Sequence, residues 1–111
     1  MLLKEVRTYE TPDGKRPFEK WFDGLKNRAV QTQISLRLGR LTLSHYDDCK
    51  FVGDKVWELR IHTSPGYRVY FTEKEEAIIF LLAGGTKGTQ EKDIEKAKQY
   101  ADDFWRNYVR S

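Results

Sequence analysis

The stretch VWELRIHTSPGYRVYF, residues 56–71, decides the fold of this chain. Over residues 56–61, and again over residues 67–72, apolar and polar side chains alternate. A period of two is typical of a β-strand with one face in the core and one face toward solvent. Between the two strands, residues 63–66 read Thr-Ser-Pro-Gly, a composition that favours a turn. The sequence therefore predicts an antiparallel hairpin with one buried side and one polar side.

Two further strands are expected around this hairpin. Residues 77–83 are apolar at every position, which indicates a strand in the interior of the sheet, covered on both faces. It ends in Gly-Gly-Thr-Lys-Gly at residues 84–88, which we expect to form a loop. A short strand at residues 6–9 precedes a turn. Residues 44–55, which contain the Asp47-Asp48 pair and the Gly53-Asp54 step, are expected to be a connecting loop.

Three segments show the helical period instead. Pro17 suits a first helical position and is followed by an apolar face at the spacing i, i+3, i+4, i+7. A second helix is predicted over residues 28–43, forming a hairpin with the first. A third begins after Thr89, an N-cap residue type. The apolar faces of the three helices consist, in order, of Phe18, Trp21, Phe22 and Leu25; of Val30, Ile34, Leu38 and Leu41; and of Ile94, Ala97, Ala101, Phe104, Trp105 and Tyr108.

The predicted order of elements is β-α-α-β-β-β-α. It indicates an α+β fold in which a helical hairpin and a C-terminal helix pack on a small, mostly antiparallel sheet. A chain of 111 residues can bury one core and is short for two. We therefore expect residues 1–111 to form a single domain.

The composition bounds the classes of function. Twenty Lys and Arg against seventeen Asp and Glu leave a net charge of +3, which permits an anionic partner without requiring one. The single cysteine, Cys49, excludes an internal disulfide, and with only two histidines we expect no metal site. Cys49 itself is expected to be a small half-buried filler. Without a signal-peptide pattern or an apolar run of bilayer length, the expected location is the cytoplasm.

Three basic residues are candidates for one chemical site. Arg60 and Arg68 share the polar side of the predicted hairpin, and Lys87 lies in the glycine-flanked loop after the next strand. Fixed guanidinium and ammonium groups stabilise the charge that develops on a phosphoryl group in its transition state, and glycines let a backbone approach a ligand closely. The alternative is a solvated sheet face whose arginines pair with surface carboxylates.

Other residues are candidates for binding. Tyr70, on the same face as Arg68, is a candidate RNA-binding residue that stacks on a base or hydrogen-bonds to a phosphate oxygen, or else an ordinary sheet aromatic. His62 is a second RNA-binding candidate. Because an imidazole titrates near neutral pH, it is also a candidate general base or acid, or else a structural histidine at a strand end. Leu36 and Leu43 point away from the apolar stripe of their helix, either as scattered surface leucines or as the seat of a partner segment.

Four motifs occur in order along the chain: VWELRI (56–61), PGYRVYF (65–71), LLAGGTKGTQ (81–90) and DIEKA (93–97). Together they resemble the RelE/HigB-like "addiction module killer" toxins of the RelE/ParE superfamily. The resemblance extends over nearly the whole chain and includes the aromatic first helix. It implies a RelE-like fold and the toxin of a type II toxin-antitoxin system.

The resemblance further implies a ribosome-dependent mRNA endoribonuclease that inhibits translation and needs no metal or other cofactor. Arg68 would then stabilise the transition-state phosphate, Arg60 would orient the nucleophile or steady the charge, and Lys87 would bind phosphate near the leaving group. The implied partners are the ribosome with its mRNA and a cognate antitoxin, commonly a small helix-turn-helix protein. The general acid and base are not assigned.

Two other functions fit the same superfamily. A ParE-like toxin poisons DNA gyrase through protein contacts, and an inactive remnant would only bind its antitoxin. The grouping of Arg60, Arg68 and Lys87 favours RNA, because a gyrase poison has no need of a phosphate-stabilising cluster. Glu58 departs from the RelE pattern, in which this position tends to be basic, and so keeps the inactive remnant among the alternatives.

Overall fold

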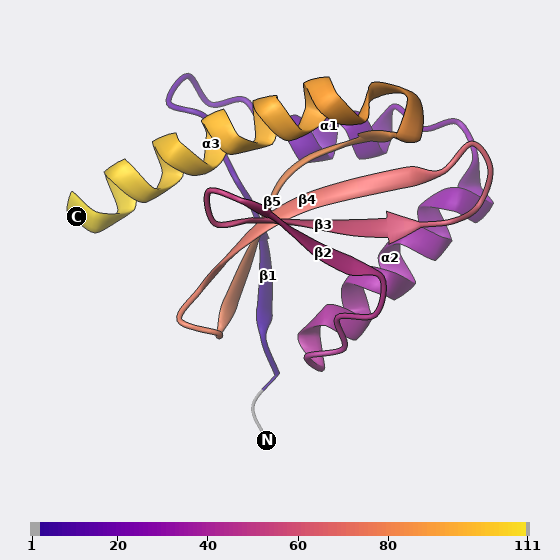
Figure 1. Ribbon diagram of the computed structural model, residues 1–111, viewed down its shortest axis with the longest axis horizontal. Coiled ribbons are helices and arrows are strands. Elements are labelled where there is room, and N and C mark those ends of the chain that lie inside the picture. The colour runs from indigo at the N-terminus through magenta and orange to yellow at the C-terminus, as the bar shows by residue number, and fades with distance from the viewer. Residues whose placement is uncertain (1–2, 111) are drawn as a thin grey trace.

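The computed structural model describes residues 3–110, with the backbone alone described for residues 108–110 (Figure 1). The elements are β1 (Glu5–Thr8), α1 (Pro17–Asp23), α2 (Arg28–Thr42), β2 (Cys49–Gly53), β3 (Val56–Ile61), β4 (Tyr67–Lys74), β5 (Ile78–Thr86), the 3₁₀ turn η1 (Lys87–Thr89) and α3 (Gln90–Arg110). Within this part of the chain, no helix combines the length and the apolar character needed to cross a bilayer.

The strands form one sheet in the order β1-β5-β4-β3-β2. β1 runs parallel to β5, and every other neighbouring pair is antiparallel. The predicted hairpin is confirmed as β3 and β4, in which Arg60 lies directly opposite Arg68. The apolar strand β5 is interior to the sheet, between β1 and β4, as its continuous hydrophobic run predicts.

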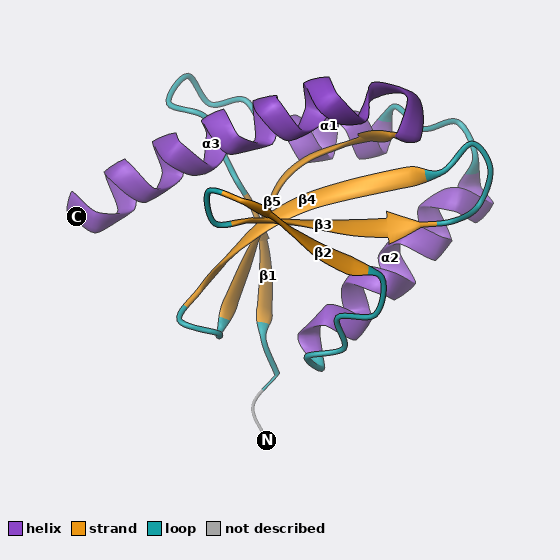
Figure 2. Cartoon of the chain, in the orientation of Figure 1, coloured by secondary structure: helices purple, strands orange, loops and turns teal. Residues whose placement is uncertain are grey.

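Helices cover both faces of this sheet, and Figure 2 shows α2 and α3 on either side of the strands. On one face, Ile34 and Leu41 of α2 pack with Leu59, Val69 and other inward residues of the strands. A second apolar cluster lies under α3 and is made of Tyr9, Val56, Tyr70, Phe80, Leu82, Ala83, Ala97, Ala101 and Phe104. The sheet is therefore the middle layer of three.

This three-layer arrangement corrects one expectation. The polar side of the β3–β4 hairpin does not face solvent, because α3 lies over it. Glu58, Arg68 and Thr72 are buried there among apolar neighbours. Each of these polar side chains consequently needs a partner or a ligand, since a buried polar group without one destabilises the fold.

The region expected to be a connecting loop, residues 44–55, contains the edge strand β2. β2 pairs with β3 from Cys49 opposite Leu59 to Gly53 opposite Val56, with a bulge after Phe51. The sequence pattern of β2 is weak because the strand is short and ends at a glycine. Backbone pairing with β3 therefore determines that this segment is a strand. The expected glycine loop also begins later than predicted, since β5 continues to Thr86.

The helices agree closely with the predicted ranges. α2 begins after Asn27, whose side chain accepts a hydrogen bond from the Val30 amide at 3.2 Å and so caps the helix. Along α3, the predicted apolar face is buried at Ala97, Ala101 and Phe104. The side chain of Tyr108, assigned to the same face, lies outside the described residues. Leu36 and Leu43 are exposed, as predicted.

Two residues of α2 test this docking. Ile34 is 0% exposed and Leu36, two positions along, is 65% exposed. We expect Ile34→Ala to lower the free energy of unfolding by about 2–5 kcal/mol, because it leaves a cavity against the sheet. Leu36→Ala should change it by less than about 0.5 kcal/mol. Equilibrium urea unfolding followed by tryptophan fluorescence measures both, and equal losses would show that α2 does not dock by this face.

Candidate functional site

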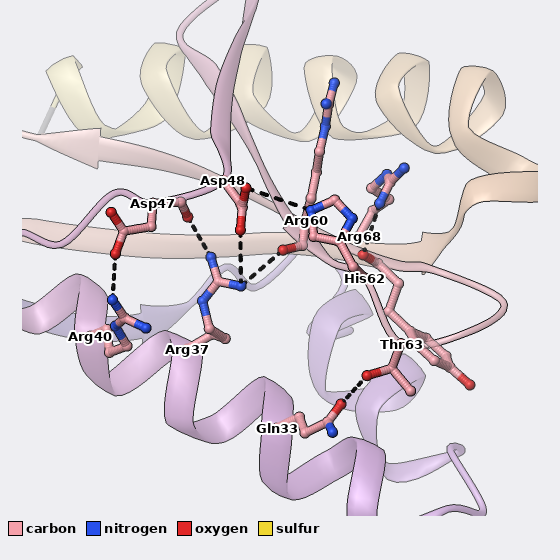
Figure 3. Close-up of polar contacts among 10 residues, drawn as sticks. Gln33, Arg37, Arg40, Asp47, Asp48, Arg60, His62, Thr63 and Arg68 are labelled. Carbon is pink, nitrogen blue, oxygen red and sulfur yellow. Dashed lines mark hydrogen bonds and ion pairs between the residues drawn. The ribbon is translucent and has the colours of Figure 1, made fainter.

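Arg60 of β3 and Arg68 of β4 lie side by side on the α3 side of the sheet. They are cross-strand partners, and Figure 3 shows both side chains pointing toward α3. The Arg60 side chain is 33% exposed, whereas Arg68 is only 7% exposed. Two like charges directly opposite one another on a sheet destabilise it unless an opposite charge is near.

That opposite charge is supplied by Glu58, which is fully buried. One carboxylate oxygen accepts a hydrogen bond from Arg60 Nε at 2.9 Å, and the other accepts from Gln90 Nε2 at 2.8 Å and Tyr70 Oη at 3.1 Å. Burial by itself would raise the pKa of Glu58, but these hydrogen bonds and the Arg60 charge outweigh it and hold the pKa below its ordinary value. The carboxylate is therefore ionised at neutral pH.

The Arg68 side chain has far fewer of its hydrogen-bonding groups paired than the Glu58 side chain. Its buried Nε has no hydrogen-bond partner within the described part of the chain. Its Nη1 donates to the carbonyl oxygen of Tyr67 over a long 3.4 Å. A buried guanidinium with an unused donor is uncommon, and an anionic ligand would satisfy it.

Lys87 is held close to the arginines by its backbone. The Lys87 amide donates to the carbonyl oxygen of Gly66, at the end of the β3–β4 turn, at 2.9 Å. A methyl group built on Gly66 would lie 3.5 Å from Cβ of Lys87 and 4.0 Å from Nη1 of Arg68. The structure therefore brings all three basic candidates to the same end of the hairpin, with the Lys87 side chain exposed.

The neighbouring glycines serve packing more than ligand approach. A Cβ on Gly84 would lie 2.1 Å from the ring of Trp21, and one on Gly85 would lie 1.8 Å from Oδ2 of Asp93. Both positions are glycine because other parts of the chain occupy that space. Gly88, in contrast, has open space beside it, its nearest neighbour being Oγ1 of Thr86 at 3.8 Å. The expectation that glycines let a ligand approach is thus limited to Gly88.

Tyr70 requires a correction. Its ring is completely buried in the apolar cluster under α3, so neither face is accessible for stacking on a base. Burial and the nearby Glu58 charge raise the pKa of Tyr70, so the hydroxyl remains protonated and donates to Glu58. Its place is therefore in the support of the arginine pair.

His62 lies at the rim of the site. It follows the last residue of β3 and its side chain is exposed, with Nε2 3.6 Å from Oδ1 of Asp48 (Figure 3). The position is open to a ligand that reaches Arg60. Cys49, in the neighbouring strand, is half-buried, and burial raises the pKa of its thiol to about 11, which suits a filler and not a nucleophile.

Sequence reasoning missed the side chains that hold Arg60. Arg37 of α2 donates to the carbonyl oxygen of Arg60 at 3.1 Å and to that of Asp47 (Figure 3). Gln90, the first residue of α3, was also missed. Among these supporting residues, only Glu58 is marked by the sequence, as an acidic residue on a basic strand face. Nothing in the sequence pattern marks Arg37 or Gln90.

The lowered pKa of Glu58 predicts a specific acid sensitivity. Its stabilising contribution is complete above 4.5, the ordinary value for a glutamate, and is lost as the pH falls below that value toward the lowered native pKa. Wild type should therefore lose more stability than Glu58→Gln between neutral pH and the range below 4.5. Urea unfolding across this range measures the difference, with the exposed Glu75→Gln as control. Parallel curves for wild type and Glu58→Gln would contradict the prediction.

Comparisons with known proteins give the family and the fold of this chain. The family described as phage derived protein Gp49-like (DUF891) matches residues 18–103. A Haemophilus influenzae protein described as uncharacterized is 41% identical over 87 residues, which cover 78% of this chain and 88% of that relative. An arginine double mutant of the E. coli toxin RelE, in the free state, has a similar structure with a TM-score of 0.59 and 16% identity, covering 86% of this chain and 98% of the RelE chain.

At 16% identity the likeness to RelE shows the fold, and it confirms the predicted RelE-like α+β architecture. The family match and the H. influenzae relative go further, because they cover most of the chain. This chain belongs to the Gp49-like family, within the RelE/ParE-like toxin superfamily.

Proposed function

We propose that this protein is the toxin of a type II toxin-antitoxin pair and that it cuts mRNA on the ribosome as a metal-independent endoribonuclease. Family and fold support the coarser part, a toxin with a cognate antitoxin. For the antitoxin we propose a small helix-turn-helix protein.

The observation that carries the proposal is the state of Arg68. Arg68 is only 7% exposed, its buried Nε has no hydrogen-bond partner among the described residues, and two further basic residues lie nearby. Removing a charge from water without a counter-ion destabilises the fold, so such an arrangement is retained where a ligand completes it. A phosphate matches the donor geometry of a guanidinium, with two oxygens able to accept in parallel.

The proposed reaction uses the RNA's own 2′-hydroxyl. This oxygen attacks the adjacent phosphorus, the bond from phosphorus to the 5′-oxygen breaks, and a cyclic phosphate and a 5′-hydroxyl result. A base takes the proton of the 2′-hydroxyl, and the leaving 5′-oxygen takes up a proton. Negative charge accumulates on the non-bridging oxygens, where Arg68 stabilises it.

The other cations then have distinct places. Arg60 is directly opposite Arg68, and in this proposal it orients the nucleophile or steadies the charge. Lys87 binds phosphate near the leaving oxygen from its position beside Gly66. His62, exposed beyond the end of β3, contacts the RNA at the rim of the site.

The openness of the site fits an RNA held by a larger particle. Arg60, His62 and Lys87 are all accessible from solvent, so the toxin alone fixes few degrees of freedom of a flexible strand. Orientation contributes a large part of the rate of such a reaction. We therefore propose the ribosome with its bound mRNA as the substrate complex.

Arg68→Ala tests the proposal. Induction of the wild-type chain should arrest growth and produce mRNA breaks detectable by primer extension. We expect Arg68→Ala to lower the cleavage rate about 100- to 1,000-fold, the loss typical for one stabilising donor. Arg106→Ala is the matched control, because Arg106 is exposed on α3 and pairs only with Asp102 on the surface among the described residues. Circular dichroism of both variants establishes that they fold.

Other outcomes identify the alternatives. Growth arrest with intact mRNA and DNA-damage signalling would support a ParE-like gyrase poison. A folded wild-type chain that causes no arrest in the absence of its partner would support an inactive remnant. Full activity in a folded Arg68→Ala variant would remove Arg68 from the mechanism.

A further inference from the structure

Glu58 is the only carboxylate among the described residues whose side chain is completely buried. It lies on β3 directly opposite Tyr70 and two residues before Arg60, one of the proposed catalytic arginines. Building on the RNA-cutting function proposed above, we propose that Glu58 is a positioning residue, which orients the guanidinium of Arg60 toward the RNA.

The two carboxylate oxygens of Glu58 have separate tasks. Oε2 accepts from Tyr70 Oη and from Gln90 Nε2, which come from β4 and from the first residue of α3. These two donors fix the plane of the carboxylate. Oε1 then accepts from Arg60 Nε at 2.9 Å, so the direction of this bond is set by groups on three different elements.

Arg60 is held at its backbone and at Nε, and is open at the end of its side chain. Its amide donates to the carbonyl oxygen of Asp48 at 2.9 Å, and its own carbonyl oxygen accepts from Arg37 at 3.1 Å. Because Glu58 engages Nε, the two Nη groups at the other end of the planar guanidinium are left for a ligand. Among the residues that the structure describes, Arg60 makes no other side-chain hydrogen bond or ion pair.

The charge of Glu58 also makes the arginine pair possible. Arg60 and Arg68 are directly opposite each other, and their repulsion would turn the more exposed Arg60 out toward water. An ionised carboxylate at Nε counteracts that repulsion on the sheet side. Glu58 thereby keeps a long, flexible side chain ready for a phosphate, which lowers the ordering required in the transition state.

A double-mutant cycle on the whole chain separates positioning from a merely structural role. The four proteins are wild type, Glu58→Gln, Arg60→Ala and the double variant, assayed on ribosomes carrying a defined mRNA. We expect Glu58→Gln to lower kcat about tenfold with little change in KM, and to cost nothing further once Arg60 is alanine. The same factor in both backgrounds would overturn the proposal. Glu75→Gln, an exposed glutamate outside the site, is the matched control.

A second readout does not depend on activity. In the ¹⁵N NMR spectrum, the Nε–H of Arg60, assigned from its absence in Arg60→Ala, should exchange slowly with water in wild type and rapidly in Glu58→Gln. An Nε–H that remains protected in Glu58→Gln would overturn the positioning role. If the wild-type chain cuts no mRNA, the proposed function fails, and the NMR result still decides whether Glu58 holds Arg60.

If a thermal melt shows that Glu58→Gln does not fold, Glu58→Asp takes its place in the test. It keeps the charge and withdraws the carboxylate by one methylene, so the bond to Arg60 Nε should be lost. We expect the same drop in kcat and the same dependence on Arg60. An unchanged kcat in Glu58→Asp would show that the direction of the bond is unimportant, which contradicts the proposal.

Discussion

The buried carboxylate of Glu58 constrains the whole α3 side of the sheet. An ionised carboxylate out of water costs several kcal/mol unless charged and polar donors surround it. Those donors come from β3, β4 and the start of α3, in Arg60, Tyr70 and Gln90. The hairpin register and the docking of α3 must therefore both be correct for the charge to be satisfied, which links the fold to the proposed site.

The covering by α3 also sets a gradient of exposure across the basic residues. Arg68 lies deepest, Arg60 is partly exposed, and Lys87 lies at the surface, tied to Gly66 through its backbone. A charge interaction is stronger where water is excluded. In the proposed reaction, the deepest arginine is thus suited to the developing charge on the phosphate, and the outer cations to strand binding.

The hairpin could be predicted from sequence because its information is local: alternation on each side of a short turn fixes which residues share a face, including Arg60 and Arg68. The burial of its polar side could not be predicted, because the hydrogen-bond partners of its polar side chains are distant in the sequence. Gln90 is 32 positions from Glu58, and Trp105, which donates to Thr72, is 33 positions away. A strand face with alternating polar residues is expected to contact solvent until such partners are known. The same holds for Gly84, whose sequence context does not reveal that Trp21 fills the space beside it.

An acidic residue beside a phosphate site has a cost, because it lowers the positive potential that attracts RNA. In the proposed mechanism this cost falls mainly on ground-state binding of the RNA. The ribosome compensates for it, because it holds the mRNA through other contacts. The benefit falls on the transition state, where Arg60 must already be aimed when charge develops. Interactions that are stronger in the transition state than in the ground state are the ones that accelerate a reaction. The position of Glu58 is consistent with an enzyme that depends on the fixed orientation of its arginine side chains more than on affinity for free RNA.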